Sequence, residues 1–186
     1  MHKVAKPNAK GPSPLKACAG LAILTLLIII PPFLGGYLSS YDLTIHISWN
    51  DLFQKQLFSG DFYPRWLFEM NGGRGSPVFF FYSPLPYYVS AFFSLFTFGP
   101  YASWYALGLT YCFALWISSV GLWKFLQFYI KQKTAYLFAI FYILLPYYVV
   151  INLHIRFAFT EFFAISWIPF LFYYTKKLIN GTNPLH

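Results

Sequence analysis

The sequence predicts an all-α, polytopic membrane protein with about four transmembrane helices and further juxtamembrane helices on the extracytoplasmic side. Of the 186 residues, 58% are hydrophobic and 10% are charged, less than half the charged fraction of a typical soluble domain. Aromatic residues make up 24% of the chain, too many for a polar surface to cover. The few charges are also strongly segregated along the sequence, and this segregation predicts the topology.

Nine lysines fall into three clusters that flank apolar stretches and contain no acid. The five acids and three arginines lie in the segments between those clusters. Because cytoplasmic loops carry an excess of Lys and Arg, we expect the clusters in the cytoplasm and the acids outside. The net charge of +8 then indicates contact with anionic membrane lipids and not with nucleic acid. The clusters are Lys3, Lys6, Lys10 and Lys16; Lys124, Lys131 and Lys133; and Lys176 with Lys177.

The spans follow from this partition. A basic cytoplasmic tail at 1–16 precedes an apolar run that is longer than a signal-peptide core and is not followed by an A-x-A cleavage pattern, so we expect an uncleaved signal anchor. A second cytoplasmic tail is expected at 178–186. The membrane domain between them, 17–177, is expected to cross the bilayer at 17–34, 102–123, 134–151 and 157–175.

Residues 35–101 are expected to form an extracytoplasmic loop that contains juxtamembrane helices. The stretch 85–98 is interrupted by Pro84 and Pro86 and is shorter than the roughly 20 residues that a span needs. A span there would also place two lysine clusters outside. Earlier in the loop, apolar residues at three- and four-residue steps predict a surface helix with Asp51 and Lys55 turned to water. These apolar residues are Ile45, Trp49, Leu52, Phe53 and Leu57.

Asp42 and His46 are the candidate catalytic residues of the outer side. Asp42 lies a few residues beyond the first span, and His46 follows four residues later on the same helical face. A carboxylate there can accept a proton from a substrate at the bilayer surface. The alternative is that Asp42 caps the helix that follows, because Asp is a favoured N-cap residue.

Two further features are candidates for binding. Glycines at 72, 73 and 75 with Arg65 and Arg74 nearby suit an anion, although an ordinary surface turn has the same composition. Glu161 lies within an apolar stretch, where an unpaired acid costs roughly 2.5–3.5 kcal/mol, so it needs a partner or a wet cavity. Arg156 is the expected partner, in a pairing that serves either structure or function.

In combination these segments resemble the N-terminal region of bacterial GT-C-type membrane proteins, including the 6-pyruvoyl-tetrahydropterin-synthase-related membrane proteins. The resemblance covers nearly the whole chain after residue 20. In the stretch Arg156-Phe-Ala-Phe-Thr-Glu161, Phe157 stands where the similar Arg-Gly-Ala-x-x-Glu stretch has glycine. The other segments are Asp42-x-x-x-His46, Gly60-Asp-Phe-Tyr-Pro-Arg-Trp66 and Asn71-Gly-Gly-x-Gly-x-Pro-x-Phe-x-Phe-Tyr-x-Pro-Leu-Pro-Tyr-Tyr88.

The resemblance implies a transferase of the bacterial inner membrane and cell envelope, with its N-terminus in the cytoplasm, that passes a sugar from a polyprenyl-phosphate donor to an extracytoplasmic acceptor. Asp42 matches the position of the usual catalytic base. The arginines are donor-phosphate candidates by charge and side of the membrane, not by a matched motif. The candidate substrate-binding residues are Arg65, Arg74, Tyr82, Arg156 and Glu161.

The resembled proteins have many more spans, so the sequence leaves open a fragment, a subunit completed by another chain, or an inactive remnant. Two non-enzymatic functions also remain: a membrane scaffold, and a component that binds or transports a polyprenyl-phosphate lipid. No cofactor and no metal site are predicted, and the sequence does not decide whether a divalent metal is needed.

Overall fold

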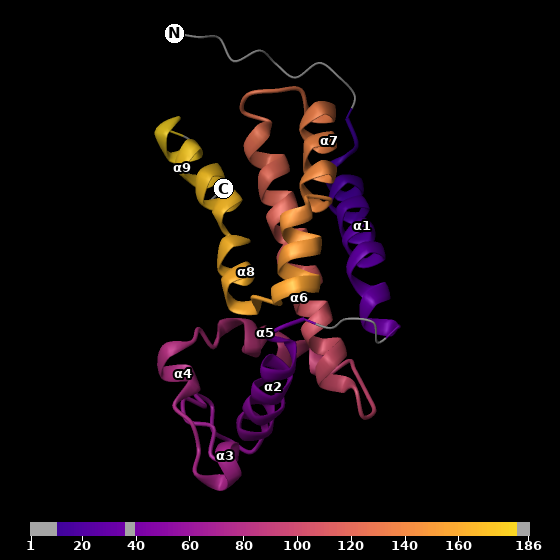
Figure 1. Ribbon diagram of the computed structural model, residues 1–186. Helices are drawn as coiled ribbons and strands as arrows, with labels where there is room; N and C mark the ends of the chain where they lie inside the picture. The colour runs from indigo at the N-terminus through magenta and orange to yellow at the C-terminus, as the bar shows by residue number, and fades with distance from the viewer. Residues whose placement is uncertain (1–10, 36–39, 182–186) are drawn as a thin grey trace.

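Figure 1 shows the chain in a computed structural model, which describes residues 11–35 and 40–181. Every regular element in these residues is a helix, and their only extended pairing is an isolated bridge between Leu67 and Ser76. The predicted all-α class is therefore confirmed. The predictions for residues 1–10 and 182–186 lie outside the described residues.

Three helices are long and apolar enough to cross a membrane. They are α1 (Pro14–Leu34), α6 (Ala102–Leu126) and the run Gln132–Arg156, with mean hydropathies of 2.4, 1.5 and 1.9. All three fall on predicted spans. The helix α1 already begins at Pro14, which suits a first helical position because its missing N–H would have no helical partner there.

The run Gln132–Arg156 consists of α7 (Gln132–Ile143) and η1 (Tyr147–Arg156), a π-helix. Between them lies Pro146, which has no N–H to continue the hydrogen bonding of α7. We predicted that this span ends at 151. The helical structure continues beyond that residue, because η1 extends to Arg156.

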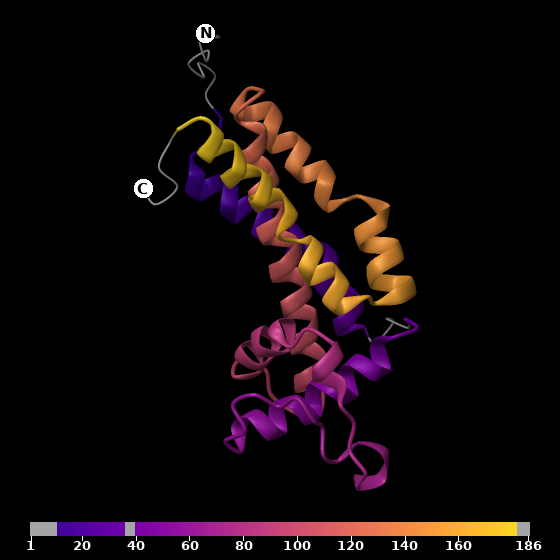
Figure 2. The ribbon, with the colours of Figure 1, turned by 90° about the vertical axis from the view of Figure 1, so that its left-hand side faces the viewer.

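The last predicted span, 157–175, is not one helix. The chain forms α8 (Phe159–Ile165) and α9 (Ile168–Ile179), which follow one another along the bundle in Figure 2. Pro169 is at the start of α9 and cannot donate a hydrogen bond to a carbonyl one turn earlier, so the helix is interrupted before it. Neither part alone has the length of a span.

The long helix α6 is central to the bundle and packs against α1, α7 and α9. Its glycines allow close approach: a Cβ at Gly108 would lie 2.9 Å from the Phe33 ring, and one at Gly121 would lie 2.8 Å from the Phe170 ring. The rings of Phe33 on α1 and Phe170 on α9 therefore pack directly against the backbone of α6. Small residues that allow such close approach are enriched where helices pack together in a membrane.

A lobe formed by residues 40–101 lies at one end of the bundle (Figures 1 and 2). It contains α2 (Leu43–Phe58), α3 (Met70–Gly73), α4 (Val78–Phe81) and α5 (Leu85–Ser94). With ten residues, α5 is too short to span a bilayer. It packs between α2 and α6, so the predicted helix at 85–98 exists in a shorter form and joins the lobe to the bundle.

The predicted surface helix corresponds to α2, and most of its expected apolar face is turned to the protein: Phe53 is buried, and Trp49, Leu52 and Leu57 pack against the core. Asp51 and Lys55 are exposed, as predicted. The face differs from the prediction in that Ile45 is 46% exposed, whereas the polar side chains of His46 and Asn50 are buried. The difference arises because α2 packs on α5 and α6, where partners exist for its polar groups. The apolar pattern alone could not reveal these partners.

The other end of the bundle carries the described lysines of the three clusters. Lys16 is in the first turn of α1, Lys124 is in the last turn of α6, and Lys176 and Lys177 are in the last turn of α9. Lys131 directly precedes α7, and Gln132 donates a 2.9 Å hydrogen bond to the Pro12 carbonyl. We call this the lysine end. No acid lies on α1, α6, α7 or α9.

Candidate functional site

The site is built where the lobe meets the end of η1. The last carbonyls of a helix have no partner within it, and here the residues before α2 supply donors. The Ser40 hydroxyl donates to the Leu153 carbonyl at 2.6 Å. The backbone N–H groups of Tyr41 and Asp42 donate to the carbonyls of Ile155 and Arg156 at 3.0 and 3.1 Å. These bonds place Asp42 beside Arg156.

The chain reverses after η1 at Phe157, which has the left-handed backbone angles φ 53° and ψ 48°. Such angles are unfavourable for a residue with a Cβ and favour glycine. Phe157 is completely buried and stacks on Phe159 with a centroid separation of 5.8 Å and on Tyr111 at 6.0 Å. Aromatic packing offsets the backbone strain.

The reversal brings Arg156 and Glu161 together. The Arg156 Nη2 lies 3.0 Å from Oε2 of Glu161, and Tyr147 donates to Oε1 of the same carboxylate at 3.3 Å. The predicted pairing of Arg156 with Glu161 is confirmed. The side chains of Arg156 and Glu161 are 47% and 42% exposed, so the pair contributes at most about 1 kcal/mol to stability. We call Asp42, Tyr147, Arg156 and Glu161 the junction cluster.

Asp42 occupies the N-cap position of α2, and its carbonyl accepts the His46 N–H at 3.0 Å. Its side chain, however, makes no capping hydrogen bond. In the described part of the chain the exposed carboxylate takes part in no hydrogen bond and no ion pair. Asp42 therefore begins α2 through its carbonyl, and its carboxylate has no partner among the described residues.

His46 is in a different environment. Its side chain is 3% exposed, and Nδ1 lies 2.6 Å from the Tyr87 hydroxyl. Burial lowers the pKa of His46 to about 4, a shift that the nearby Asp42 carboxylate partly offsets. Burial likewise raises the pKa of Tyr87 well above its usual value. The two rings therefore form a neutral, buried pair that fixes α2 on α5.

The remaining candidates lie within the lobe. The Arg65 guanidinium lies 4.1 Å from the centroid of the Phe80 ring, and Tyr82 packs on Trp49 at 4.9 Å. Arg74 directly follows α3, which lies at the far side of the lobe from α8 in Figures 1 and 2. Among the described residues, no hydrogen bond, ion pair or ring contact joins Arg65 or Arg74 to the junction cluster.

The glycine-rich segment around α3 is a closed turn. Asn71, Gly72, Gly73 and Gly75 all have positive φ. The Asn71 amide donates to the Gly75 carbonyl at 3.0 Å, and a Cβ at Gly75 would collide with the Trp66 indole. These contacts favour the surface-turn interpretation of the sequence over the anion-binding one.

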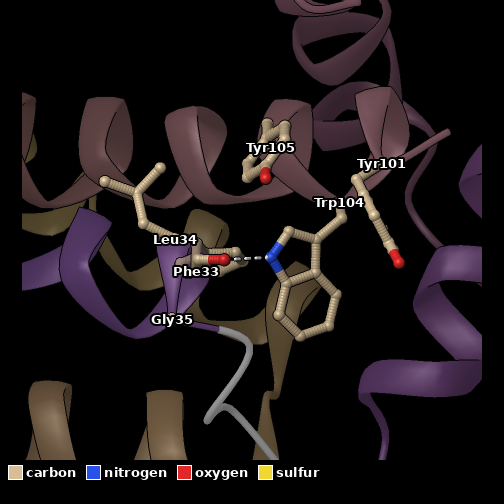
Figure 3. A pocket seen from close by; sticks show the side chains of 6 residues that line it. All are labelled: Phe33, Leu34, Gly35, Tyr101, Trp104 and Tyr105. Carbon is tan, nitrogen blue, oxygen red and sulfur yellow. Dashed lines mark hydrogen bonds between the residues drawn. The ribbon is translucent and has the colours of Figure 1, made fainter. Parts of the chain in front are cut away.

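Two cavities lie near the junction of lobe and bundle. One of about 410 Å³ is lined by Ser40, Tyr41, His154 and Ile155, the residues next to Asp42 and Arg156. The other, of about 460 Å³, lies between the end of α1 and the start of α6 (Figure 3). There the Trp104 indole donates to the Phe33 carbonyl at 2.8 Å. Its lining residues are Phe33, Leu34, Gly35, Tyr101, Trp104 and Tyr105.

Sequence reasoning missed Ser40, Tyr87 and Tyr147, each of which holds a candidate residue in place. No spacing in the sequence links them to their partners.

The sequence also carries no signal for Asn152. It is fully buried in η1, and neither its amide nitrogen nor its oxygen has a hydrogen-bond partner among the described residues. π-helical turns are rare and are frequently found at functional sites, and a buried amide without a hydrogen-bond partner is an exception in native structures.

No protein-family model, no curated protein and no solved structure matches this chain. Among the described residues, no three His, Cys, Asp or Glu side chains form a group that could hold a metal ion. The functional argument therefore depends on the geometry of the site.

The left-handed backbone at Phe157 predicts that a glycine variant is more stable than an alanine variant, the reverse of the order usual in regular secondary structure. Phe157→Ala and Phe157→Gly each remove the buried ring and should destabilise the protein by about 3–5 kcal/mol. Glycine relieves the left-handed strain, so Phe157→Gly should be more stable than Phe157→Ala by about 1 kcal/mol. Unfolding in detergent measures the difference. An alanine variant as stable as the glycine variant would contradict the strain.

Burial of His46 predicts a loss of stability in acid. The unfolded chain binds a proton near the usual pKa of 6.5 and the folded chain only near pH 4, so stability falls as pH is lowered through this window. The full loss is on the order of 3 kcal/mol. Thermal unfolding at pH 7 and pH 5 measures it. His46→Gln should remove this dependence and the control His154→Gln should keep it; an identical response in both variants would contradict the assignment.

Proposed function

We propose that this chain belongs to a membrane glycosyltransferase that transfers a sugar from a polyprenyl-phosphate donor to an acceptor on the extracytoplasmic side, with Asp42 as the general base. The observation that carries the proposal is the hydrogen bond from the Asp42 N–H to the Arg156 carbonyl. It holds the backbone of Asp42, whose side chain is exposed, next to the backbone of Arg156 at the end of the bundle opposite the described lysines of the three clusters.

In the proposed reaction, Asp42 accepts the proton of an acceptor hydroxyl. The oxygen of that hydroxyl forms a bond to the anomeric carbon of the donor sugar. The bond between this carbon and the phosphate oxygen breaks, and the polyprenyl phosphate leaves with the electron pair. Arg156 stabilises the negative charge on the leaving phosphate.

Arg156 can serve a phosphate while it remains paired with Glu161. A guanidinium carries five N–H donors in a planar fork, and Glu161 occupies two of them, at 3.0 and 3.5 Å. Glu161 and Tyr147 then orient the guanidinium. His46 has no exposed face for a substrate, so we assign it a positioning role through Tyr87.

For the membrane arrangement we propose that α1, α6, the run Gln132–Arg156, and α8 with α9 cross the bacterial inner membrane. The lysine end and the N-terminus would lie in the cytoplasm and the lobe outside. The acids lie at the end of the bundle opposite the described lysines of the three clusters, and this segregation supports the orientation.

A second candidate function is binding of the polyprenyl-phosphate lipid without chemistry. It requires only the Arg156 donors that Glu161 leaves unoccupied, and no proton acceptor. An apolar groove of about 260 Å³ between α1, α5 and α6 would suit a prenyl chain in either function. The two functions differ in what they require of Asp42.

Substitution of Asp42 separates the two functions. Asp42→Asn should lower sugar transfer by roughly 10²–10⁴-fold and leave donor binding nearly unchanged. Both are measured in membrane vesicles with a panel of radiolabelled polyprenyl-phosphate monosaccharides. Asp51→Asn, which removes the same charge from the exposed face of α2, should change neither quantity. Full transfer by Asp42→Asn would contradict the catalytic assignment, and donor binding without transfer by the wild type would favour the lipid-binding function.

Cysteine labelling tests the orientation. In a chain with Cys18 and Cys112 replaced by serine, Ser59→Cys and His154→Cys should react with an impermeant thiol reagent applied to intact cells. Tyr129→Cys and Leu178→Cys should react only after the cells are broken. All four positions are exposed in the structure, so labelling reports the side of the membrane. Reaction at 129 or 178 in intact cells would contradict the arrangement.

A further inference from the structure

A cavity at the lysine end joins three helices that are far apart in the sequence. Its volume is about 460 Å³, and it lies between the first residue of α1 and the last turns of α6 and α9. It is therefore at the opposite end of the bundle from the junction cluster. The lining residues are Pro14, Trp123, Lys124, Gln127, Phe128, Tyr173 and Lys177.

Two lysines of this lining converge on one aromatic ring. The ammonium nitrogens of Lys124 and Lys177 lie 5.9 and 5.8 Å from the centroid of the Tyr173 ring. All three side chains are half-buried. A cation within about 6 Å of an aromatic centroid is attracted to the ring, so Tyr173 holds both ammonium groups at the cavity and limits their freedom to extend into solvent.

The surroundings of the cavity are positive. None of the helices that form it carries an acid, and the five acids of the chain lie directly before α2, on α2, on the segment between α2 and α3, or on α8. The first turn of α1 also contributes: it contains no acid, and the Ser13 side chain does not cap it. The amino end of a helix favours negative charge.

A simpler account of the lysines is that each complements the negative carboxyl end of its own helix. That account explains one lysine in the last turn of α6 and two in the last turn of α9. It does not explain why one from each helix lines the same cavity against the same ring. Lys131 and Lys133 lie at the same end but do not line it.

We infer that this cavity binds the headgroup of an anionic phospholipid of phosphatidylglycerol type, with the phosphate between Lys124 and Lys177. The headgroup is the occupant that the position favours, because lysines close to spanning helices lie where the charged lipid surface is. The Tyr173 hydroxyl adds a donor suited to phosphate and glycerol oxygens, and so does the Gln127 amide N–H that is not donated to the Trp123 carbonyl. The inference depends on the membrane location of the bundle but not on the glycosyltransferase chemistry.

Native mass spectrometry of the full chain released from detergent tests this site. The chain is titrated with phosphatidylglycerol, with phosphatidylcholine of the same acyl chains, and with inorganic phosphate. We expect one tightly retained phosphatidylglycerol per chain and no comparable retention of the neutral lipid or of phosphate. Lys124→Gln should weaken retention about fivefold and Lys124→Gln with Lys177→Gln about thirtyfold, since each lysine near the surface contributes about 1 kcal/mol.

Lys133→Gln is the matched control, because it removes the same charge from the same end at an exposed position outside the cavity. It should retain phosphatidylglycerol as the wild type does. Equal losses in Lys124→Gln and Lys133→Gln would overturn the site and leave only diffuse surface charge. Retention of phosphate as tight as that of the lipid would overturn the headgroup assignment. Tyr173→Leu, which keeps both charges but removes the aromatic ring, should also weaken retention of phosphatidylglycerol. Unchanged retention in this variant would contradict the proposal that the Tyr173 ring holds Lys124 and Lys177 at the cavity.

Discussion

Hydrogen bonds between residues 40–42 and the last carbonyls of η1 determine how the lobe meets the bundle. They satisfy carbonyls that a helix end would otherwise leave unpaired, and they fix the start of α2 at the same time. With α2 fixed there, His46 reaches Tyr87 on α5, and α5 in turn packs on α6. The position of Asp42 beside Arg156 is thus a product of backbone pairing and does not depend on any attraction between their charges.

Much of the fold could be predicted because apolar length and charge segregation are recorded directly in the sequence. The three long helices fall on predicted spans, and Glu161 was expected to pair with Arg156 because an unpaired acid in an apolar stretch is costly. The helix breaks at Pro146 and Pro169 could not be predicted in the same way. Proline predicts an interruption, but the neighbouring apolar runs continue across it, so composition does not reveal whether the helix bends, ends or becomes a π-helix.

The candidate site was less predictable, because its geometry depends on contacts across many residues of sequence. The four-residue spacing of Asp42 and His46 correctly places both at the start of one helix. It cannot show that His46 turns inward to Tyr87 while Asp42 remains exposed, because that difference is set by α5, 41 residues further along the chain from His46. The same limit applies to Arg74: its charge was evident, but its distance from the junction cluster depends on the fold of the lobe.

The π-helical winding of η1 bears on how related chains should be compared. A π-helix closes each hydrogen bond one residue later than an α-helix does, so η1 accommodates its residues in wider turns. A relative with one residue fewer between 147 and 156 could wind this segment as a regular α-helix. Each residue of an α-helix turns by about 100°, so such a deletion would rotate the arginine away from the glutamate across the reversal. A single-residue gap in this segment would therefore distinguish relatives that lack the ion pair from those that keep it, even where both charged residues are present.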